Sequence, residues 1–235
     1  MSETITLLIP VLNEIDGLRQ IMPRIQKKLF DQILIVDGQS TDGSAVYARE
    51  EGYEVYIQKK PGIRHAYIEA FPHVRGDLVI TFSPDGNSIP ELLPALIAKI
   101  KEGYDMVIVS RYFDGAKSED DNWMTAFGNW MFTRIINILH GGNYTDAMVM
   151  YRAYRKKIFY DLQLDNENAY LPERLLCTVI SMEPLLSVRV AKRKLSFCDM
   201  AGDEPPRIGG SRKLLPFRWG ISYLLQVFRE VYYWR

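Results

Sequence analysis

The sequence contains little cysteine and little histidine, and it carries no excess of charge. Its 235 residues include 2 cysteines and 3 histidines. Two cysteines in a chain of this length do not form a disulfide framework, so we expect a reducing compartment. Lys+Arg 29 and Asp+Glu 29 cancel, so the overall charge offers no basis for binding nucleic acid, and we expect none.

Long apolar segments are also missing. No apolar run approaches the roughly 20 residues that a helix needs to cross a bilayer. Residues 1–4 lack the basic region of a signal peptide and lead directly into a short apolar run. We therefore expect a cytoplasmic protein that is either soluble or peripheral at the cytosolic face of a membrane.

Short apolar runs alternate with helical patterns through about residue 110. Strands are expected at residues 5–9, 32–36, 54–57, 77–82 and 105–109. Helices are expected at residues 18–29, 44–50, 64–71 and 90–100. This alternation predicts an α/β protein with a mostly parallel central sheet covered by helices, the Rossmann-like arrangement.

The second half of the chain is less regular. It predicts a long amphipathic helix at residues 123–139 and short strands at 146–152 and 185–190. Residues 201–213 are rich in turn formers and basic side chains and are expected to form a loop. Because neither a repeat nor a low-complexity linker is present, we expect residues 1–213 to form one domain.

Residues 214–235 are expected to form an amphipathic C-terminal helix. The apolar positions on one face are Ile221, Leu224, Leu225, Phe228, Val231 and Tyr232. Trp219 and Trp234 are of a type that favours a membrane interface. The pattern does not decide what this helix packs against. The alternatives are the domain, another subunit such as the second copy in a homodimer, and a membrane surface.

The segment 82–91 follows a buried apolar run and places Asp85 at the exit of a strand, with Asn87 two residues later. In α/β folds the carboxyl edge of the sheet is where ligands bind, and hard divalent cations prefer oxygen ligands. Asp85 and Asn87 are therefore candidate ligands for Mg²⁺ or Mn²⁺. The alternative is a turn that caps the helix starting at Pro90, with Asp85 in a structural role.

Two other segments end strands in the same way. Residues 10–14 read Pro-Val-Leu-Asn-Glu, and residues 37–44 read Asp-Gly-Gln-Ser-Thr-Asp-Gly-Ser. The carboxyl ends of successive strands meet at one crevice. There the Asp37 carboxylate could accept a hydrogen bond from the ring N–H of a nucleotide base. The alternative interpretation makes Asn13, Asp37 and Asp42 turn residues and helix caps.

Together these three segments resemble the inverting GT-A glycosyltransferases of family 2. Residues 109–112 and 146–155 are similar to the branch with dolichyl-phosphate mannose synthase and polyprenyl-phosphate glycosyltransferases. The resemblance implies a GT-A fold with a small irregular subregion on the acceptor side. It also implies metal-assisted transfer of a sugar from a UDP-type or GDP-type donor. The acceptor is either polyprenyl phosphate or a soluble hydroxyl compound, and a donor-binding subunit without catalysis is the alternative.

The resemblance also assigns residues to the donor. The family's metal motif is Asp-x-Asp, and its first aspartate is replaced here by Ser83, which leaves Asp85 and Asn87 to hold the metal. The implied nucleotide-sugar-binding residues are Pro10, Asn13, Glu14, Asp37, Arg64 and Asp85. Arg64 belongs to a basic segment, residues 59–64, that is otherwise interpreted as a solvated turn.

On the acceptor side the implied phosphate-binding residues are Arg111, Tyr112, Arg207, Arg212 and Lys213. The chain departs from the lipid-phosphate enzymes at two positions, where Asn122 and Ala126 replace an arginine and a serine. The acidic run at residues 118–121 would repel a phosphate. A hydroxyl acceptor would instead need a catalytic base, for which Asp146 and Glu173 are the candidates.

Overall fold

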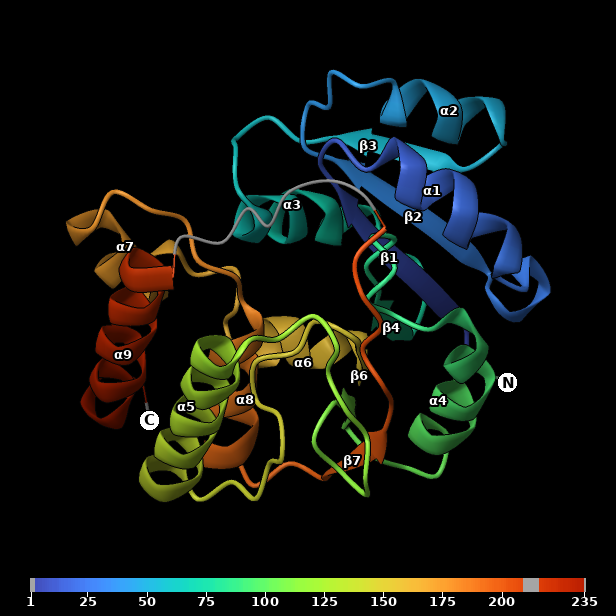
Figure 1. The fold of residues 1–235 in the computed structure, drawn as a ribbon. Helices are drawn as coiled ribbons and strands as arrows, with labels where there is room; N and C mark the ends of the chain where they lie inside the picture. The colour runs from blue at the N-terminus through green and yellow to red at the C-terminus, as the bar shows by residue number, and fades with distance from the viewer. Residues whose placement is uncertain (1–2, 209–215, 235) are drawn as a thin grey trace.

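A computed structural model describes residues 3–208 and 216–234 of the chain. Its strands form one mixed sheet with the order β3-β2-β1-β4-β6-β5-β7 (Figure 1). The strands are β1 (Ile5–Val11), β2 (Gln32–Asp37), β3 (Glu54–Ile57), β4 (Leu78–Thr81), β5 (Met106–Ser110), β6 (Arg152–Arg155) and β7 (Phe197–Ala201). Only β6 runs antiparallel to its neighbours among these strands, so the prediction of a mostly parallel α/β sheet is confirmed.

Helices cover both faces of the sheet. The α-helices are α1 (Ile15–Ile21), α2 (Ser44–Glu50), α3 (Ile63–Ala70), α4 (Leu93–Ile100), α5 (Trp123–His140), α6 (Lys156–Asp161), α7 (Leu171–Leu175), α8 (Glu183–Lys192) and α9 (Pro216–Tyr233). Short 3₁₀ turns are η1 (Met22–Arg24), η2 (Lys27–Leu29), η3 (Phe71–His73), η4 (Pro90–Leu92) and η5 (Glu167–Tyr170).

The apolar core lies in two layers, one on each face of the sheet. Strand β1 is buried at every position, and its side chains alternate between the layers. Leu8 packs in the layer under α3, α5 and α8, whereas Leu7 and Ile9 pack in the layer under α1 and α4. This continuous burial is the reason that the strand reads as an unbroken apolar run.

Three elements differ from the prediction. The helix expected at residues 18–29 ends at Ile21, because Pro23 cannot continue its hydrogen bonding, and 3₁₀ turns follow. The strand expected at 185–190 is instead part of α8, whose residues 183–191 are all buried, and a short apolar run alone does not separate these two structures. The strand expected at 146–152 begins only at Arg152.

The C-terminal helix α9 packs against α5, α7 and α8 (Figure 1). Its Glu230 accepts two hydrogen bonds of 2.9 Å from Arg189 of α8, and both side chains are fully buried. The ring of Trp234 lies 4.8 Å from the same guanidinium. One face of α9 is therefore built into the domain.

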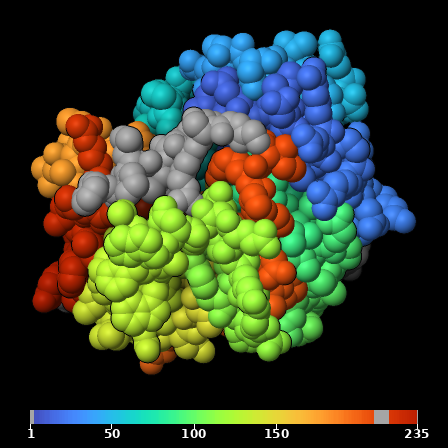
Figure 2. All heavy atoms as spheres, viewed as in Figure 1, coloured from blue at the N-terminus to red at the C-terminus, as the bar shows by residue number. Residues whose placement is uncertain are grey.

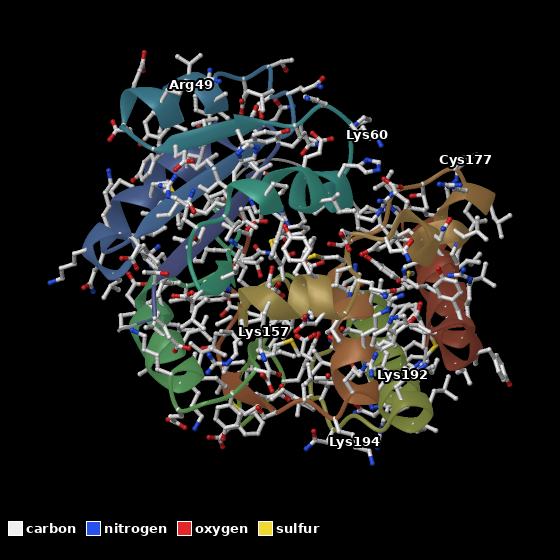
Figure 3. The ribbon with its side chains drawn as sticks, turned by 180° about the vertical axis from the view of Figure 1, so that it is seen from behind. Arg49, Lys60, Lys157, Cys177, Lys192 and Lys194 are labelled. Atoms are coloured by element: carbon white, nitrogen blue, oxygen red, sulfur yellow. The ribbon has the colours of Figure 1, made fainter. Side chains whose placement is uncertain are left out.

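Both cysteines are free. Cys177 is exposed at the outer edge of the molecule, directly after α7 (Figure 3), and Cys198 lies on β7. Among residues 3–208 and 216–234, no helix is both long enough and apolar enough to cross a membrane.

Candidate functional site

One cavity of ≈ 830 Å³ opens at the carboxyl ends of β1, β4 and β5. Polar residues line one end of it, namely Glu14, Ser83, Asp85, Asn87, Arg111, Glu204 and Arg207. Apolar residues of α5 and α9 line the other end, among them Met124, Phe127, Met131, Ile221 and Leu224. The cavity therefore joins a polar end to an apolar end.

The two turns that follow β1 and β2 hold each other. Asn13 has a positive φ of 53°, a conformation that asparagine tolerates better than most residues. Its Oδ1 accepts a hydrogen bond of 2.8 Å from the Thr41 N–H, and Asp42 Oδ2 accepts one of 3.0 Å from the Ile15 N–H. Asn13 and Asp42 thus shape the wall of the cavity without lining it.

Asp37 ends β2 and is 1% exposed. Both carboxylate oxygens accept from the Ser40 N–H, at 2.9 and 3.1 Å. Gly38, the next residue, lines the cavity, and so does Pro10. Asp37 lies just behind this wall, and its role in reading a base stays a prediction.

The turn after β4 brings Asp85 into the cavity. Its Oδ1 accepts from the Asn87 N–H at 3.1 Å, and its Oδ2 lies 2.7 Å from Nη1 of Arg207. The same Nη1 lies 4.0 Å from Oε1 of Glu14. Asn87 donates from Nδ2 to Asp120 at 3.1 Å, while no described residue donates a hydrogen bond to its buried Oδ1.

These groups fit a divalent ion that the substrate helps to bind. The Asp85 carboxylate and the unused Asn87 Oδ1 supply hard oxygen ligands from one turn. The described residues contain no group of three or more His, Cys, Asp or Glu that could hold a metal by itself. Mg²⁺ is often held in this way, by one or two carboxylates together with substrate phosphates.

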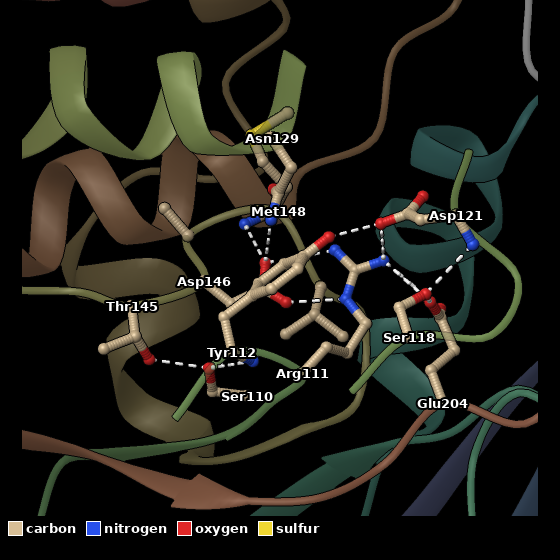
Figure 4. Close-up of polar contacts among 12 residues, drawn as sticks. Ser110, Arg111, Tyr112, Ser118, Asp121, Asn129, Thr145, Asp146, Met148 and Glu204 are labelled. Carbon is tan, nitrogen blue, oxygen red and sulfur yellow. Dashed lines mark hydrogen bonds and ion pairs between the residues drawn. The ribbon is translucent and has the colours of Figure 1, made fainter. Parts of the chain in front are cut away.

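Arg111, directly after β5, is surrounded by acids (Figure 4). Its Nε and Nη2 donate to the two oxygens of Asp146 at 2.6 and 3.2 Å. Its Nη1 lies 3.1 Å from Glu204 Oε2 and 3.6 Å from Asp121 Oδ2. The Tyr112 hydroxyl donates to the same Asp121. Arg111 is therefore ion-paired with three acids, Asp121, Asp146 and Glu204.

Asp146 is fully buried beneath this arginine and does not line the cavity. Burial alone raises its pKa, but Arg111 and the hydrogen bonds from Arg111 and Asn129 outweigh burial and hold the pKa of Asp146 below its ordinary value. Burial raises the pKa of Glu204, although Arg111 and Ser118 act in the opposite direction. Asp146 is thus a weaker base, and Glu204 a stronger base, than an ordinary side chain of its type.

Arg64 and Glu173 lie against each other, away from the cavity lining. Nη2 of Arg64 donates to Glu173, and Nη1 lies 3.3 Å from Glu167. The guanidinium also lies 4.4 Å from the centre of the Tyr170 ring. Glu173 Oε2 accepts from the Ile180 N–H at 3.1 Å. A residue predicted to bind the donor and one predicted to be a base therefore form an ion pair with each other.

Of the other predicted residues, Arg212 and Lys213 lie outside the described residues. The sequence analysis missed Glu204 and Glu183, which both line the cavity. Glu204 could have been noticed as an acid three residues before Arg207 in the basic loop. Glu183, which accepts from the Tyr67 hydroxyl at 2.8 Å, had no signal because a strand was expected where α8 forms.

A largely parallel sheet with an acidic turn at the exit of β4 and a cavity at its carboxyl edge is the arrangement of a glycosyltransferase of the GT-A fold. The model of glycosyl transferase family 2 matches residues 6–163, and the chain belongs to this family.

Two curated proteins illustrate the relationship. The chain is 26% identical over 233 residues to the glycosyltransferase AglJ of Haloferax volcanii, covering 97% of this chain and 72% of AglJ. It is 30% identical over 166 residues to an undecaprenyl-phosphate 4-deoxy-4-formamido-L-arabinose transferase of an Enterobacter species. That match covers 66% of this chain and about half, 49%, of the transferase.

Among solved structures, the chain is similar to glucosyl-3-phosphoglycerate synthase from Mycobacterium tuberculosis in complex with Mn²⁺, UDP and phosphoglyceric acid. The TM-score is 0.72 at 17% identity, with 98% of this chain and 79% of the synthase covered. The similarity at this identity establishes the shared fold.

Proposed function

We propose that this glycosyltransferase moves a sugar, with inversion, from a nucleotide-diphosphate donor of the UDP or GDP type to polyprenyl phosphate. The observation that carries the proposal is the cavity, which joins a polar end at Asp85 to an apolar end between α5 and α9. An apolar channel beside a polar donor site suits an acceptor that has a phosphate head and a hydrocarbon tail. The undecaprenyl-phosphate relative supports the same class of acceptor.

At the donor end, Asp37 would read the base while Pro10, Asn13 and Glu14 form or shape the wall around the nucleotide. Asp85 and Asn87 would hold Mg²⁺ or Mn²⁺, which when bound stabilises the charge that develops on the leaving diphosphate. The unused Asn87 Oδ1 supports this assignment. The Mn²⁺ complex of the structurally similar synthase supports the choice of a divalent ion.

At the acceptor end, neither of the two carboxylates predicted as a catalytic base lines the cavity. A hydroxyl nucleophile needs a base that reaches it, whereas a phosphate is already ionised. The two carboxylates predicted as bases, Asp146 and Glu173, are each paired with an arginine and lie outside the cavity lining. We propose that Asp146 positions Arg111, and Glu173 positions Arg64, while Arg111 and Arg207, which line the cavity, serve the phosphates.

Contact with a membrane surface is part of the proposal. Helices α5 and α9 lie side by side at one end of the molecule (Figure 2). Their exposed apolar residues include Trp123, Phe127 and Trp130 on α5 and Ile221, Leu225 and Phe228 on α9. Because Phe127 and Ile221 also line the cavity, this surface is continuous with its apolar end. Aromatic and aliphatic side chains of this kind favour a bilayer interface.

The test is a transfer assay with purified protein, radiolabelled UDP-sugars and GDP-sugars, Mn²⁺ and polyprenyl phosphate in detergent. We expect labelled sugar to appear on the lipid and not on the unphosphorylated polyprenol. Transfer to soluble hydroxyl acceptors alone would contradict the lipid acceptor. Binding of UDP or GDP without turnover of any donor would identify a nucleotide-sugar-binding subunit without catalysis.

A further inference from the structure

A second cavity, of ≈ 270 Å³, lies beside α5, and we call it the side pocket. Four residues of α5 line it, namely Trp130, Thr133, Arg134 and Asn137. The rest of the lining is Tyr112, after β5, with Tyr144 and Thr145, before β6. Among the described residues, this lining has no member in common with that of the main cavity. Tyr112, predicted to bind an acceptor phosphate, therefore belongs to a separate pocket.

The walls of the side pocket are joined to one another by hydrogen bonds. The hydroxyl groups of Ser110 and Thr145 lie 2.6 Å apart, and the Tyr112 N–H donates to the same Ser110 hydroxyl at 3.2 Å (Figure 4). On the α5 side, Asn137 Nδ2 donates to the Tyr144 carbonyl at 2.9 Å, and Asn137 Oδ1 accepts from the Tyr144 N–H at 3.0 Å. The pocket is thus preorganised, which lowers the cost of ordering it around a ligand.

Arg134 is the cationic side chain of the side pocket. Its guanidinium lies 5.9 Å from the centre of the Trp130 ring, and no acid among residues 3–208 and 216–234 forms an ion pair with it. The Thr133 hydroxyl already accepts from the Ala147 N–H at 3.1 Å, and the Tyr112 hydroxyl already donates to Asp121. Arg134 is therefore the group of the lining that is best placed to hold an anion, and arginine suits the fork geometry of a phosphate.

The position of Arg134 on α5 relates the side pocket to the exposed apolar surface. Trp123, Phe127, Trp130 and Ile138 are exposed on α5, and Arg134 is spaced four residues from both Trp130 and Ile138. At this spacing the five side chains form one stripe along the helix. If the stripe lies in a bilayer interface, the Arg134 guanidinium meets the head groups, where lipid phosphates are the abundant anions.

We propose that the side pocket binds the phosphate of an anionic phospholipid head group. Arg134 donates to the phosphate oxygens, and the rings of Trp130 and Tyr112 flank the head group. The inference rests on the membrane contact in the proposed function. A lipid held in this pocket orients α5 on the bilayer, so that Phe127, which lines the apolar end of the main cavity, faces the acyl chains.

The experiment titrates the full chain with dihexanoyl phosphatidylglycerol, kept below its micelle concentration, and follows the indole N–H signal of Trp130 by nuclear magnetic resonance. We expect a saturable shift of this signal. Arg134→Gln should bind the lipid about tenfold more weakly, the size of one charge-assisted hydrogen bond, and Arg134→Lys should lie in between. Inorganic phosphate should bind at least tenfold more weakly than the lipid, because it makes no apolar contact with the rings. Equal affinity for the two would identify a site for free phosphate and overturn the lipid.

Arg218→Gln is the matched control, because it removes the same charge from an exposed arginine of α9 that lines neither cavity. Its lipid affinity should equal that of the wild type. An unchanged affinity in Arg134→Gln, or an equal loss in both variants, overturns the side pocket as a lipid site.

A transfer assay separates this inference from the proposed function. Arg134→Gln should transfer sugar to polyprenyl phosphate in detergent at the wild-type rate, because Arg134 lies outside the main cavity. Loss of transfer in this variant would make the side pocket part of the acceptor site and overturn the inference. If the wild-type protein transfers no sugar to polyprenyl phosphate but the lipid titrations behave as expected, the proposed function fails and the side pocket stands.

Discussion

At the scale of residues, Arg111 and the acids around it determine the charge of the proposed acceptor side of the cavity. Three carboxylates, of Asp121, Asp146 and Glu204, lie within 3.6 Å of its guanidinium. An incoming phosphate meets this negative charge as well as the positive charge of Arg111. Arg111 is thus kept ordered by acids that differ in how readily they take up a proton.

Replacing Asp85 should abolish the effect of metal on nucleotide binding. Asp85→Asn keeps the shape of the side chain and removes the charge that a divalent ion requires. We expect the gain in UDP or GDP affinity on adding Mn²⁺ to fall by about 100-fold, the upper end for loss of a metal's supporting group. Calorimetric titration measures it, with Asp16→Asn on the exposed side of α1 as control. An intact Mn²⁺ effect would remove Asp85 from the metal site.

Asp146→Asn should destabilise the protein in a way that depends on pH. The change breaks the hydrogen bonds of a charged pair, which costs about 2 kcal/mol in the free energy of unfolding. Because the pKa of Asp146 is depressed in the folded state, its stabilisation is present above the ordinary value of 3.8 and is lost as the pH falls through the folded pKa.

Urea denaturation of both proteins tests this. The difference in the free energy of unfolding should be constant from about pH 7 to about pH 5 and should shrink below pH 3.8. A difference that is the same at pH 7 and pH 3 would show that the charge of Asp146 contributes nothing.

At the scale of elements, sequence patterns correctly predicted the strands, turns and helix starts that depend on residues close together in the chain. The strand at 78–81, the turn with Asp85 and the helix after Pro90 follow from apolar alternation, turn formers and a proline at the start of the helix. The pairs Arg64–Glu173 and Arg111–Glu204 could not be predicted, because their members are 109 and 93 residues apart. Contacts of this kind depend on the topology of the whole sheet.

The pair of Arg189 and Glu230 joins α8 to α9 and offers a test of how the C-terminal helix is held. Glu230→Leu alone leaves a fully buried guanidinium with only the carbonyls of Leu162 and Gln163. We expect it to lower the free energy of unfolding by about 3–5 kcal/mol. The double variant with Arg189→Met should recover part of this loss, because no buried charge remains.

Thermal or urea unfolding of the wild type, both single variants and the double variant forms a double-mutant cycle. If the effects of the two single changes on the free energy of unfolding add up to the effect of the double variant, the ion pair does not couple α8 and α9.

At the scale of the whole molecule, polarity is divided along the cavity. The turns after β1 and β4, the segment after β5 and residues 203–207 supply most of the charged lining groups, whereas α5 and α9 supply mainly apolar side chains. Composition could not predict this division, because apolar residues on α5 and α9 look alike in sequence whether they are buried, as Val227 is, or exposed, as Phe228 is. Only the fold separates the residues that stabilise the domain from those left for a partner.

That exposed apolar surface predicts binding to lipid vesicles. Trp123 is 79% exposed and Phe228 is 52% exposed, and burial of each in a bilayer interface contributes about 2 kcal/mol. The double variant Trp123→Ser with Phe228→Ser should therefore bind anionic vesicles at least tenfold more weakly in a co-sedimentation assay. Val46→Ser, which changes a side chain 56% exposed on α2 at the other end of the molecule, is the control. Equal sedimentation of all three proteins would mean that α5 and α9 face water or another protein, and the lipid acceptor would then have to be delivered by a carrier.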